Sequence, residues 1–191
     1  MKLLEDRILK DGTVLENNTL KVDAFLNHEI DVRLINECAK EWHRLFADEG
    51  ITKILTIEAS GIGIASITAL HFGVPVVFAK KSRGANIGKN LYSTRVVSYT
   101  HGLMYDVNVA KERIKEGDRI LLIDDFLANG SALRALTKIC EMAGAVVVGA
   151  GIVIEKAYQK GGKELREAGL RIESLAMIES MDGGTVKFCR K

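Results

Sequence analysis

The chain has 191 residues, which is enough for one compact domain with a single sizeable core. Hydrophobic residues make up 47% and charged residues 27%, as is ordinary for a globular chain. The net charge of +2, with Lys and Arg spread along the chain, argues against nucleic acid as a partner. No apolar run reaches the roughly 18 residues that span a bilayer, so we expect no membrane partner. Acidic residues within MKLLEDRILKDG also argue against a signal peptide.

The three cysteines, Cys38, Cys140 and Cys189, are an odd number without CxxC spacing. This pattern predicts a reducing compartment, and therefore a cytoplasmic protein, with neither a disulfide framework nor a zinc site. Cys38 and Cys140 lie in helical patterns, where a cysteine is typically a small buried hydrophobe.

Hydrophobic periodicity predicts a chain of alternating helices and strands. Residues 1–10 suit a short helix that ends near Gly12, and Asp31 is a predicted N-cap of a helix that ends at Gly50. The elements then predicted, in chain order, are a strand at 51–59, a turn at 60–63, a helix at 64–73, a strand at 74–81, a loop at 81–91, antiparallel strands at 92–100 and 103–110, a strand at 119–125, a helix at 131–144, a strand at 145–156, and strands at 170–180 and 185–189.

Apolar strands that alternate with helices of ten or more residues predict an α/β fold with a mainly parallel sheet covered on both faces. Ligands in such sheets bind beyond the carboxyl ends of the strands. Three unusual segments fall at those ends: EASGIG, DDFLANGS and IEK. We therefore expect an active site there.

The segment LLIDDFLANGSA, residues 121–132, combines a buried strand, two acids and a turn of small residues. Ala128, Asn129, Gly130 and Ser131 lie between the strand and the next helix. Small residues let backbone N–H groups approach a phosphate, and the positive end of the helix dipole points to the same place. The turn therefore predicts a monophosphate site. It is neither a P-loop nor a dinucleotide fingerprint, because GK[ST] and GxGxxG are missing.

Asp124 and Asp125 come two residues before this turn, at the distance that a sugar ring spans from its own phosphate. Two carboxylates at this place can accept hydrogen bonds from vicinal hydroxyls and stabilise a positively charged ring carbon. The alternative is an acid that caps the helix and a solvated neighbour.

Four apolar residues, Asp-Asp, two apolar residues and a small Ala/Asn/Gly turn resemble the phosphoribosyl-diphosphate signature of the type I phosphoribosyltransferases. Many relatives close the turn with Thr, whereas this chain has Ala132, so a phosphate-binding hydroxyl must come from Ser131 or be absent. More narrowly, nearly the whole chain resembles the bacterial members that use xanthine, through LKVDAFLNHEID at 20–31, ITKILTIEASGI at 51–62, LLIDDFLANG at 121–130 and GIVIEK at 151–156.

The resemblance implies a single domain over residues 1–191 with the type I fold. In that fold a twisted, mainly parallel sheet is flanked by helices, and residues 1–30 with the C-terminal strands form a small hood over the base. Relatives are usually homodimers. The implied reaction transfers the 5-phosphoribosyl group from phosphoribosyl diphosphate to xanthine, giving xanthosine 5'-monophosphate (XMP) and diphosphate. Mg²⁺ is expected to bind largely through the substrate, with no all-protein cage.

The resemblance also assigns roles to residues around the sugar. Asp124 and Asp125 would hold the ribose hydroxyls and offset the charge of an oxocarbenium-like ring. The 5'-phosphate would meet residues 128–132, and the leaving diphosphate would meet a turn that is otherwise a plain strand-to-helix connection: Ala59, Ser60 and Gly61.

By the same resemblance, Leu20, Asn27 and Lys156 contact the purine. Lys156 would donate to the 6-oxo group, which disfavours adenine, although a lysine at a strand end is otherwise typically solvated. Asn27 can present its amide N–H₂ to the 2-oxo group that xanthine alone offers, but an amide can also reverse and accept.

The segment from Lys81 to Asn90 would be the flexible lid of the family, which excludes water from the reactive sugar. Its Lys81, Arg83 and Lys89 would meet the diphosphate, with Tyr92 closing behind them. The alternative is a solvated basic loop.

Two other functions compete with xanthine transfer. A hypoxanthine–guanine phosphoribosyltransferase differs at the base, so Asn27 is the discriminating residue. A phosphoribosyl-diphosphate-sensing regulator that binds nucleic acid would need a winged-helix domain or a strong basic face, and only about thirty residues precede the Asp31 helix, too few for such a domain. We therefore expect an enzyme.

Overall fold

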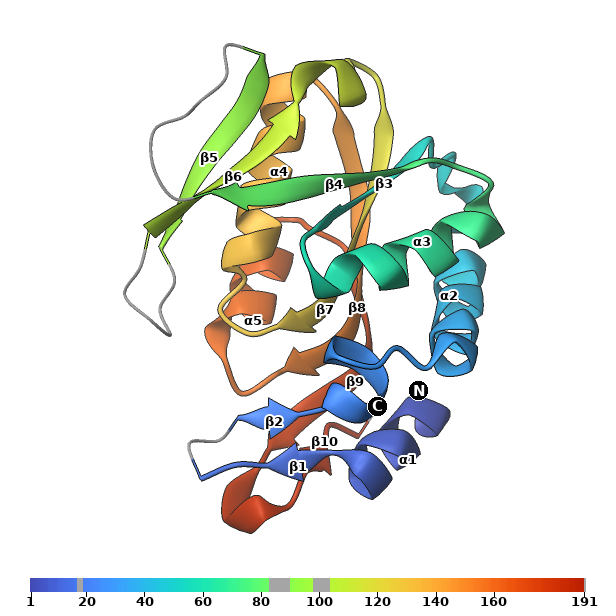
Figure 1. The fold of residues 1–191 in the computed structure, drawn as a ribbon, viewed down its shortest axis with the longest axis vertical. Coiled ribbons are helices and arrows are strands. Elements are labelled where there is room, and N and C mark those ends of the chain that lie inside the picture. The colour runs from blue at the N-terminus through green and yellow to red at the C-terminus, as the bar shows by residue number, and fades with distance from the viewer. Residues whose placement is uncertain (17–18, 83–89, 98–103, 191) are drawn as a thin grey trace.

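The computed structural model describes residues 1–16, 19–82, 90–97 and 104–190 (Figure 1). The helices, including the short π and 3-10 helices marked η, are α1 (Lys2–Asp11), η1 (Asp23–Asn27), α2 (Val32–Phe46), η2 (Ala47–Glu49), α3 (Ser60–Phe72), η3 (Lys111–Arg113), α4 (Ser131–Ala143), α5 (Lys160–Glu167) and η4 (Asp182–Gly184). The strands are β1 (Thr13–Val14), β2 (Leu20–Lys21), β3 (Lys53–Ile57), β4 (Val76–Ser82), β5 (Leu91–Val97), β6 (Met104–Ala110), β7 (Arg119–Leu127), β8 (Val146–Lys156), β9 (Ile172–Ser180) and β10 (Lys187–Phe188).

Eight strands form one sheet in the order β10-β9-β8-β7-β3-β4-β6-β5, and β1 and β2 form a separate pair. The central strands β9, β8, β7, β3 and β4 are parallel, while β10, β6 and β5 join antiparallel at the edges. This confirms the predicted α/β fold with a mainly parallel sheet. From β3 the chain crosses through α3 to β4, and from β7 it crosses through α4 to β8 on the other side. The gap between β3 and β7 is therefore the topological switch point, where α/β sheets bind ligands.

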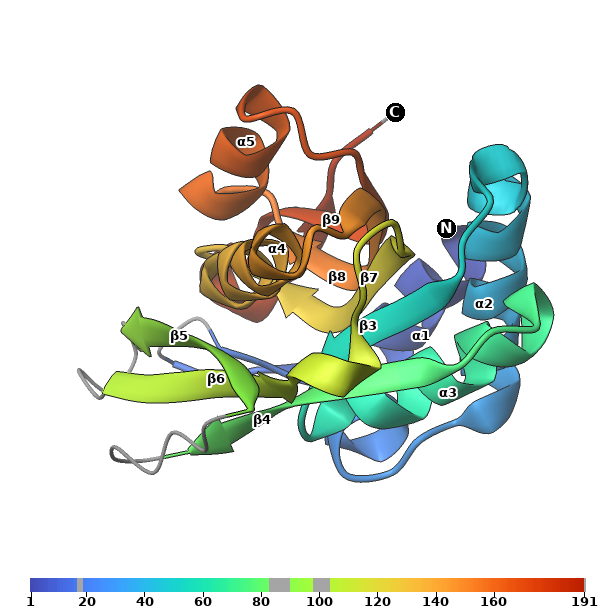
Figure 2. The same cartoon turned by 90° about the horizontal axis from the view of Figure 1, so that it is seen from above.

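The two faces of the sheet carry separate hydrophobic clusters. Helices α1, α2 and α3 cover one face, while α4 and α5 lie on the other (Figure 2). The first cluster gathers around Trp42, Phe25 and Phe46, and the second around Leu122, Leu136 and Ile139. Burial on both faces explains why β3, β7 and β8 read as continuous apolar runs in the sequence.

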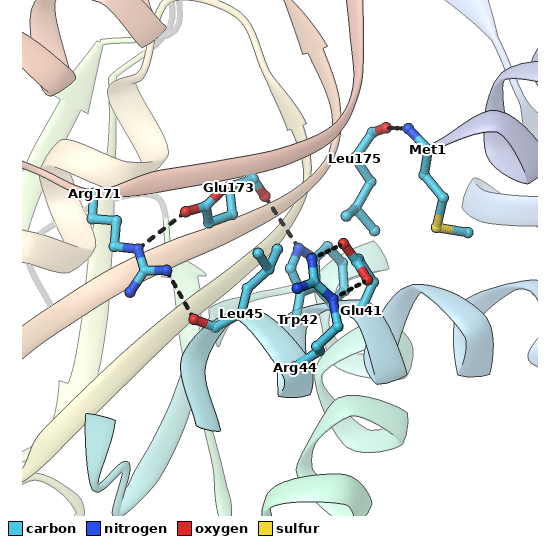
Figure 3. Close-up of polar contacts among 8 residues, drawn as sticks. All are labelled: Met1, Glu41, Trp42, Arg44, Leu45, Arg171, Glu173 and Leu175. Atoms are coloured by element: carbon cyan, nitrogen blue, oxygen red, sulfur yellow. Dashed lines mark hydrogen bonds and ion pairs between the residues drawn. The ribbon is translucent and has the colours of Figure 1, made fainter. Parts of the chain in front are cut away.

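Glycines in β8 make room for the aromatic residues of α2. A Cβ atom at Gly149 would lie 2.6 Å from Phe46, and one at Gly151 would lie 2.9 Å from the Trp42 ring. Glycine within a strand typically marks such a close approach. The Trp42 ring nitrogen then donates to the Glu173 carbonyl of β9 at 3.1 Å (Figure 3). Helix α2 is thereby fixed against the centre of the sheet.

Strand β9 and the residue before it also contact the ends of two helices. Arg171 donates to the Leu45 carbonyl at 2.8 Å, and the Met1 ammonium group donates to the Leu175 carbonyl (Figure 3). The segment carrying β1, β2 and η1 follows α1 and lies beyond the carboxyl ends of β7 and β8 (Figure 1).

The predicted N-cap of α2 is confirmed. The Asp31 carboxylate accepts hydrogen bonds from the backbone N–H groups of Arg33 and Leu34, both at 3.1 Å, and from Arg7 at 2.7 Å. The Leu34 N–H, and then the Arg7 guanidinium, hold the pKa of Asp31 below its usual value.

Two predicted boundaries at the active-site edge were wrong. Helix α3 begins at Ser60, so the predicted turn at 60–63 is its first turn. Gly61 serves close packing there, because a Cβ atom at this position would lie 2.1 Å from the Thr56 hydroxyl. Strand β7 continues past Asp125 to Leu127, because Phe126 and Leu127 still pair with β8. The acids therefore lie within the strand, near its end.

Both ends of the predicted loop at 81–91 belong to strands. Strand β4 extends to Ser82 and β5 begins at Leu91, because both strands pair with β6. The antiparallel pair of β5 and β6 confirms that part of the prediction. Arg83 and Lys89 lie outside the described residues. Within the described ranges, none of the helices has the length and apolar character needed to cross a bilayer.

Candidate active site

The two acids of β7 are adjacent in the chain but differ in exposure. Asp124 is 5% exposed, whereas Asp125 is half-buried. Each carboxylate accepts a hydrogen bond from the following backbone N–H, Asp125 to Asp124 at 3.1 Å and Phe126 to Asp125 at 2.8 Å. These bonds orient both side chains while leaving acceptor positions on each carboxylate for further donors, such as sugar hydroxyls.

Burial makes Asp124 an unusual carboxyl group. Desolvation, and then the charge of Asp125, raise its pKa well above the ordinary value. Lys81 of β4 opposes this rise through its positive charge. A carboxylate that is poorly compensated in the protein alone interacts strongly with any positive charge that develops beside it.

The turn after β7 has the geometry of an anion site. Gly130 is the N-cap of α4 and has a φ of 78°, a left-handed conformation that favours glycine. The side-chain oxygen of Asn129 bends the turn by accepting a hydrogen bond from the Ser131 N–H at 3.0 Å. Because the first N–H groups of a helix have no partner within it, the start of α4 offers donors to a bound anion.

A hollow of about 730 Å³ opens beside this turn. Asn129 and Ser131 line it together with three cationic side chains from β5, α4 and α5: Arg95, Arg134 and Lys160. Neither acid of β7 lines this hollow. Glu164 of α5 also lines it, so the lining keeps a net positive charge and suits the phosphate end of a ligand rather than the sugar or the base.

Ala132 does not line the hollow but packs against the second hydrophobic cluster. Of the two positions considered for a phosphate-binding hydroxyl, only Ser131 faces this space.

The start of α3 lies across the switch point from the acids. Ala59 is exposed at its N-cap, Ser60 is its first residue and Gly61 is buried. A Cβ atom at Gly61 would lie 3.5 Å from an Asp124 carboxylate oxygen. The structure thus brings the predicted diphosphate turn and the acid pair together, although they are more than sixty positions apart in the sequence.

Lys81, near the end of β4, is a further charged residue at the acid pair, because its positive charge acts on Asp124. Its backbone N–H donates to the Glu58 carboxylate at 2.7 Å, and its ammonium group lies 5.8 Å from the centre of the Tyr105 ring.

Lys156 ends β8 beside the phosphate turn. Its neighbour Glu155 pairs with Leu127, so Lys156 lies next to the residues that begin the turn. Lys156 is half-buried, and desolvation lowers its pKa.

The two predicted contacts from the N-terminal segment differ in character. Leu20 in β2 is 4% exposed and packs in the first hydrophobic cluster, so it offers a ligand its backbone rather than its side chain. Asn27 is exposed at the last position of η1. Their roles toward the base stay predictions.

Sequence reasoning missed several residues around the site. Tyr105 of β6 lies close enough to Asp124 for the charge of Asp124 to raise its pKa, in addition to the effect of burial. Arg134 donates to the Asn129 carbonyl at 2.8 Å and fastens the phosphate turn. Helix α5 is absent from the predicted elements. A tyrosine in an alternating strand and an arginine in a first helical turn carry no local signal that separates them from surface residues.

The fold and the site together define the class of protein. Residues 21–188 match the family model described as the phosphoribosyl transferase domain, so the chain belongs to that family. Among curated proteins, it is 57% identical over 190 residues to "Xanthine phosphoribosyltransferase" of Lachnoclostridium phytofermentans, covering 98% of both chains. It is 53% identical over 191 residues to a protein of the same name from Bifidobacterium adolescentis, covering 98% of this chain and 99% of that one.

Solved structures support the fold. An adenine phosphoribosyltransferase from Giardia lamblia, complexed with 9-deazaadenine, superposes with a TM-score of 0.78 at 22% identity and covers 93% of this chain and 98% of its own. The adenine phosphoribosyltransferase from Rhodothermus marinus gives a TM-score of 0.75 at 21% identity, covering 93% of this chain and all of that one.

Proposed function

We propose that this protein is a purine-salvage enzyme that transfers the 5-phosphoribosyl group from phosphoribosyl diphosphate to xanthine, forming XMP and diphosphate. The observation that carries the proposal is the juxtaposition at the switch point. An amide-rich phosphate turn, two carboxylates and the N-terminus of α3 meet at one edge of the sheet. The curated relatives that bear the xanthine name over their full length support the choice of base.

The reaction follows from where charge develops. Cleavage of the bond between C1 of the ribose and the diphosphate oxygen leaves a positively charged ring. In our proposal Asp124 and Asp125 accept hydrogen bonds from the ribose hydroxyls and stabilise the positive charge of the ring. Residues 128–132 hold the 5'-phosphate. The leaving diphosphate carries negative charge, and it is stabilised by contacts with Ala59, Ser60, Gly61 and Lys81.

The residues at the site fit Mg²⁺ as a partner of the substrate. Asp124, Asp125 and the buried Thr56 hydroxyl, which has no hydrogen-bond partner among the described residues, provide only oxygen atoms, the ligands that Mg²⁺ prefers. No group of three His, Cys, Asp or Glu residues in the described parts of the chain is arranged to hold a metal. When bound, Mg²⁺ would neutralise charge on the diphosphate, and most of its ligands would be substrate oxygens and water.

Base selection is proposed to come from both sides of the purine. Lys156 at the end of β8 donates to the 6-oxo group, and Asn27 of η1 donates to the 2-oxo group. The hood that residues 1–30 form with the C-terminal strands then covers the base, with Leu20 contributing backbone atoms. Support for this arrangement comes from the position of the N-terminal segment beyond the carboxyl ends of β7 and β8 (Figure 1).

Two features of the whole protein complete the proposal. The three free cysteines support a cytoplasmic location, because they are typical of a reducing compartment. The family resemblance supports a homodimer, which light scattering would detect as a mass about twice the 20.9 kDa of the chain.

The direct test is incubation of the protein with phosphoribosyl diphosphate, Mg²⁺ and each purine in turn, with chromatographic detection of the nucleotide. We expect XMP to form with the highest kcat/KM. Faster transfer to hypoxanthine or guanine would favour the alternative base, and no nucleotide with any purine would contradict the enzyme.

Asn27→Ala tests the base contact. We expect kcat/KM for xanthine to fall at least about tenfold more than for hypoxanthine, because only xanthine has the 2-oxo group that the amide would meet. Equal losses for the two bases would refute the assignment of Asn27. The neighbouring exposed residue gives a matched control, since His28→Ala should leave the ratio unchanged.

A further inference from the structure

Helix α5 touches both ends of the proposed ligand site. It begins four residues after Lys156, where the chain leaves β8, and it leads into β9. Its only large apolar side chain, Leu165, packs in the second hydrophobic cluster. The remaining contacts of α5 with the site come from glycine and charged residues.

The first of these contacts is with the phosphate turn. A Cβ atom at Gly161 would lie 2.4 Å from the Ala128 carbonyl oxygen and 2.5 Å from the Gly130 nitrogen. The backbone of α5 therefore rests directly on the turn, with no room for a side chain between them. Even a methyl group at position 161 would displace one of the two elements.

The second contact is with the strand that carries Lys156. Glu155 is 2% exposed, and its two carboxylate oxygens accept hydrogen bonds from the two terminal nitrogens of Arg166, at 2.7 and 2.6 Å. The Ser174 hydroxyl of β9 also donates to this carboxylate. A Cβ atom at Gly162 would lie 2.0 Å from the same group. The Glu155 carboxylate is thus enclosed between α5, β8 and β9, while Arg166 is half-buried above it.

An exposed ion pair reinforces the first contact. Arg134 donates to Glu164 of α5 at 2.8 Å and, with the same nitrogen, to the Asn129 carbonyl of the turn at 2.8 Å. Three separate attachments therefore link α5 to the phosphate turn and to the residue that precedes Lys156.

We infer that α5 acts as a spacer that sets the distance between the phosphate turn and Lys156, and that Glu155 and Arg166 are its positioning residues. The inference rests on the proposed function. A nucleotide whose phosphate lies at the turn and whose base meets Lys156 must match that distance. Neither Glu155 nor Arg166 needs to touch the ligand for this effect.

A positioning role explains the chemistry of the pair better than stability alone. Pairing a buried carboxylate with a cation gives little net stability relative to apolar packing of the same volume, because burial costs the carboxylate its hydration. The planar fork of arginine on a carboxylate, however, fixes direction as well as distance. Small displacements of positioned groups reduce ligand complementarity strongly.

Arg166→Lys tests this role because it keeps the charge and removes the fork. Calorimetry would compare XMP, which spans both ends of the site, with ribose 5-phosphate, which has no base and so reaches the turn and the two acids but not Lys156. We expect the affinity for XMP to fall about tenfold while that for ribose 5-phosphate stays within about twofold. Glu155→Gln keeps the shape of the acceptor and should likewise weaken the binding of XMP but not that of ribose 5-phosphate. This variant serves as the test if Arg166→Lys fails to fold.

The surface of α2 offers a matched control. Arg44 forms the same two-point contact with Glu41, at 2.9 and 2.7 Å, away from the site (Figure 3). Arg44→Lys should leave both affinities unchanged. The inference would be overturned by a folded Arg166→Lys protein with wild-type affinity for XMP, or with equal losses for both ligands. Failure of the wild-type protein to bind XMP would overturn the proposed function as well.

Discussion

Asp124 and Asp125 illustrate how much the environment of one side chain adds to its chemistry. The adjacent acids were predicted as a pair, and a linear sequence gives no reason to separate them. The structure buries Asp124 beside Gly61 and leaves Asp125 half-exposed. Burial cannot be predicted locally, because Gly61 of α3, which packs beside Asp124, is more than sixty positions away in the chain.

The raised pKa of Asp124 predicts a conflict between stability and activity. Folding makes ionisation of Asp124 less favourable than in the unfolded chain, so the stability that Asp124 contributes is fully present below the unfolded pKa of about 3.9 and is lost as pH rises through the folded value. We therefore expect Asp124→Asn to raise Tm at pH 7, with the difference vanishing near pH 4, while turnover is lost. Thermal unfolding across this pH range measures the effect.

Asp118 gives a control of opposite sign. Burial raises its pKa, but hydrogen bonds from Lys53 at 2.5 Å and from the Lys115 N–H at 2.7 Å outweigh burial and lower it overall. Asp118→Asn should therefore reduce Tm at pH 7. The same pH dependence in both variants would contradict the assignment to Asp124.

Asp125→Asn tests the proposed chemistry at the more accessible acid. We expect kcat to fall by about 100-fold or more, because a neutral amide no longer stabilises the positive ring, while circular dichroism stays that of the folded protein. Wild-type turnover in this variant would remove Asp125 from the catalytic group.

At the scale of elements, helix starts were predicted well where a local signal exists. Asp31 caps α2 through backbone N–H groups two and three residues ahead, a pattern that is written in the sequence. The start of α3 was misplaced because glycines in SGIG are typical of a turn, whereas Gly61 is needed for contact with Thr56 on β3.

Asp31→Ala should lower the free energy of unfolding by about 1–2 kcal/mol, through loss of the cap and of the Arg7 contact. Because the pKa of Asp31 is lowered, its contribution is present above the usual carboxyl range and is lost as pH falls through the folded value. Denaturant titrations at pH 7 and pH 3 measure both effects. Asp31→Asn retains a capping acceptor and should recover most of the lost free energy of unfolding. If Asp31→Asn were as unstable as Asp31→Ala, the result would argue against capping.

Helix α5 shows where element prediction fails. Its sequence KGGKELRE has one large apolar residue and two adjacent glycines, which weaken a helix by about 1 kcal/mol each relative to alanine. The helix is stabilised by contacts with the phosphate turn and β8 that join distant parts of the chain. Tertiary contacts therefore override the local preference.

At the scale of the whole molecule, the order of strands creates the site. Strands β3 and β7 are neighbours in the sheet, yet more than sixty positions separate them in the chain. Their following helices lie on opposite faces of the sheet, so the start of α3 and the start of α4 flank the switch point from two sides. A ligand that binds at the switch point would contact both halves of the sheet and should stabilise the protein as a unit.

Thermal unfolding with ligands tests this coupling and the proposed role of Mg²⁺. At 100 times its Kd, phosphoribosyl diphosphate with Mg²⁺ should raise Tm by on the order of 5–10 °C. Mg²⁺ alone should leave Tm unchanged, because the described residues form no metal cage. A similar rise with Mg²⁺ alone would instead indicate a metal site made by the protein.

The sequence by itself determined the α/β class, the presence of a strand followed by a turn in LLIDDFLANGSA, though not where that strand ends, and the capped start of α2, because each depends on periodicity or on neighbours within a few residues. Only the tertiary structure decided that Asp124 is buried beside Gly61, that the Leu20 side chain belongs to the core, and that α5 joins the phosphate turn to β8. The physical reason is the same in each case. Burial, close packing and charge pairing depend on atoms that distant segments bring together, and such contacts cannot be predicted from the local sequence pattern.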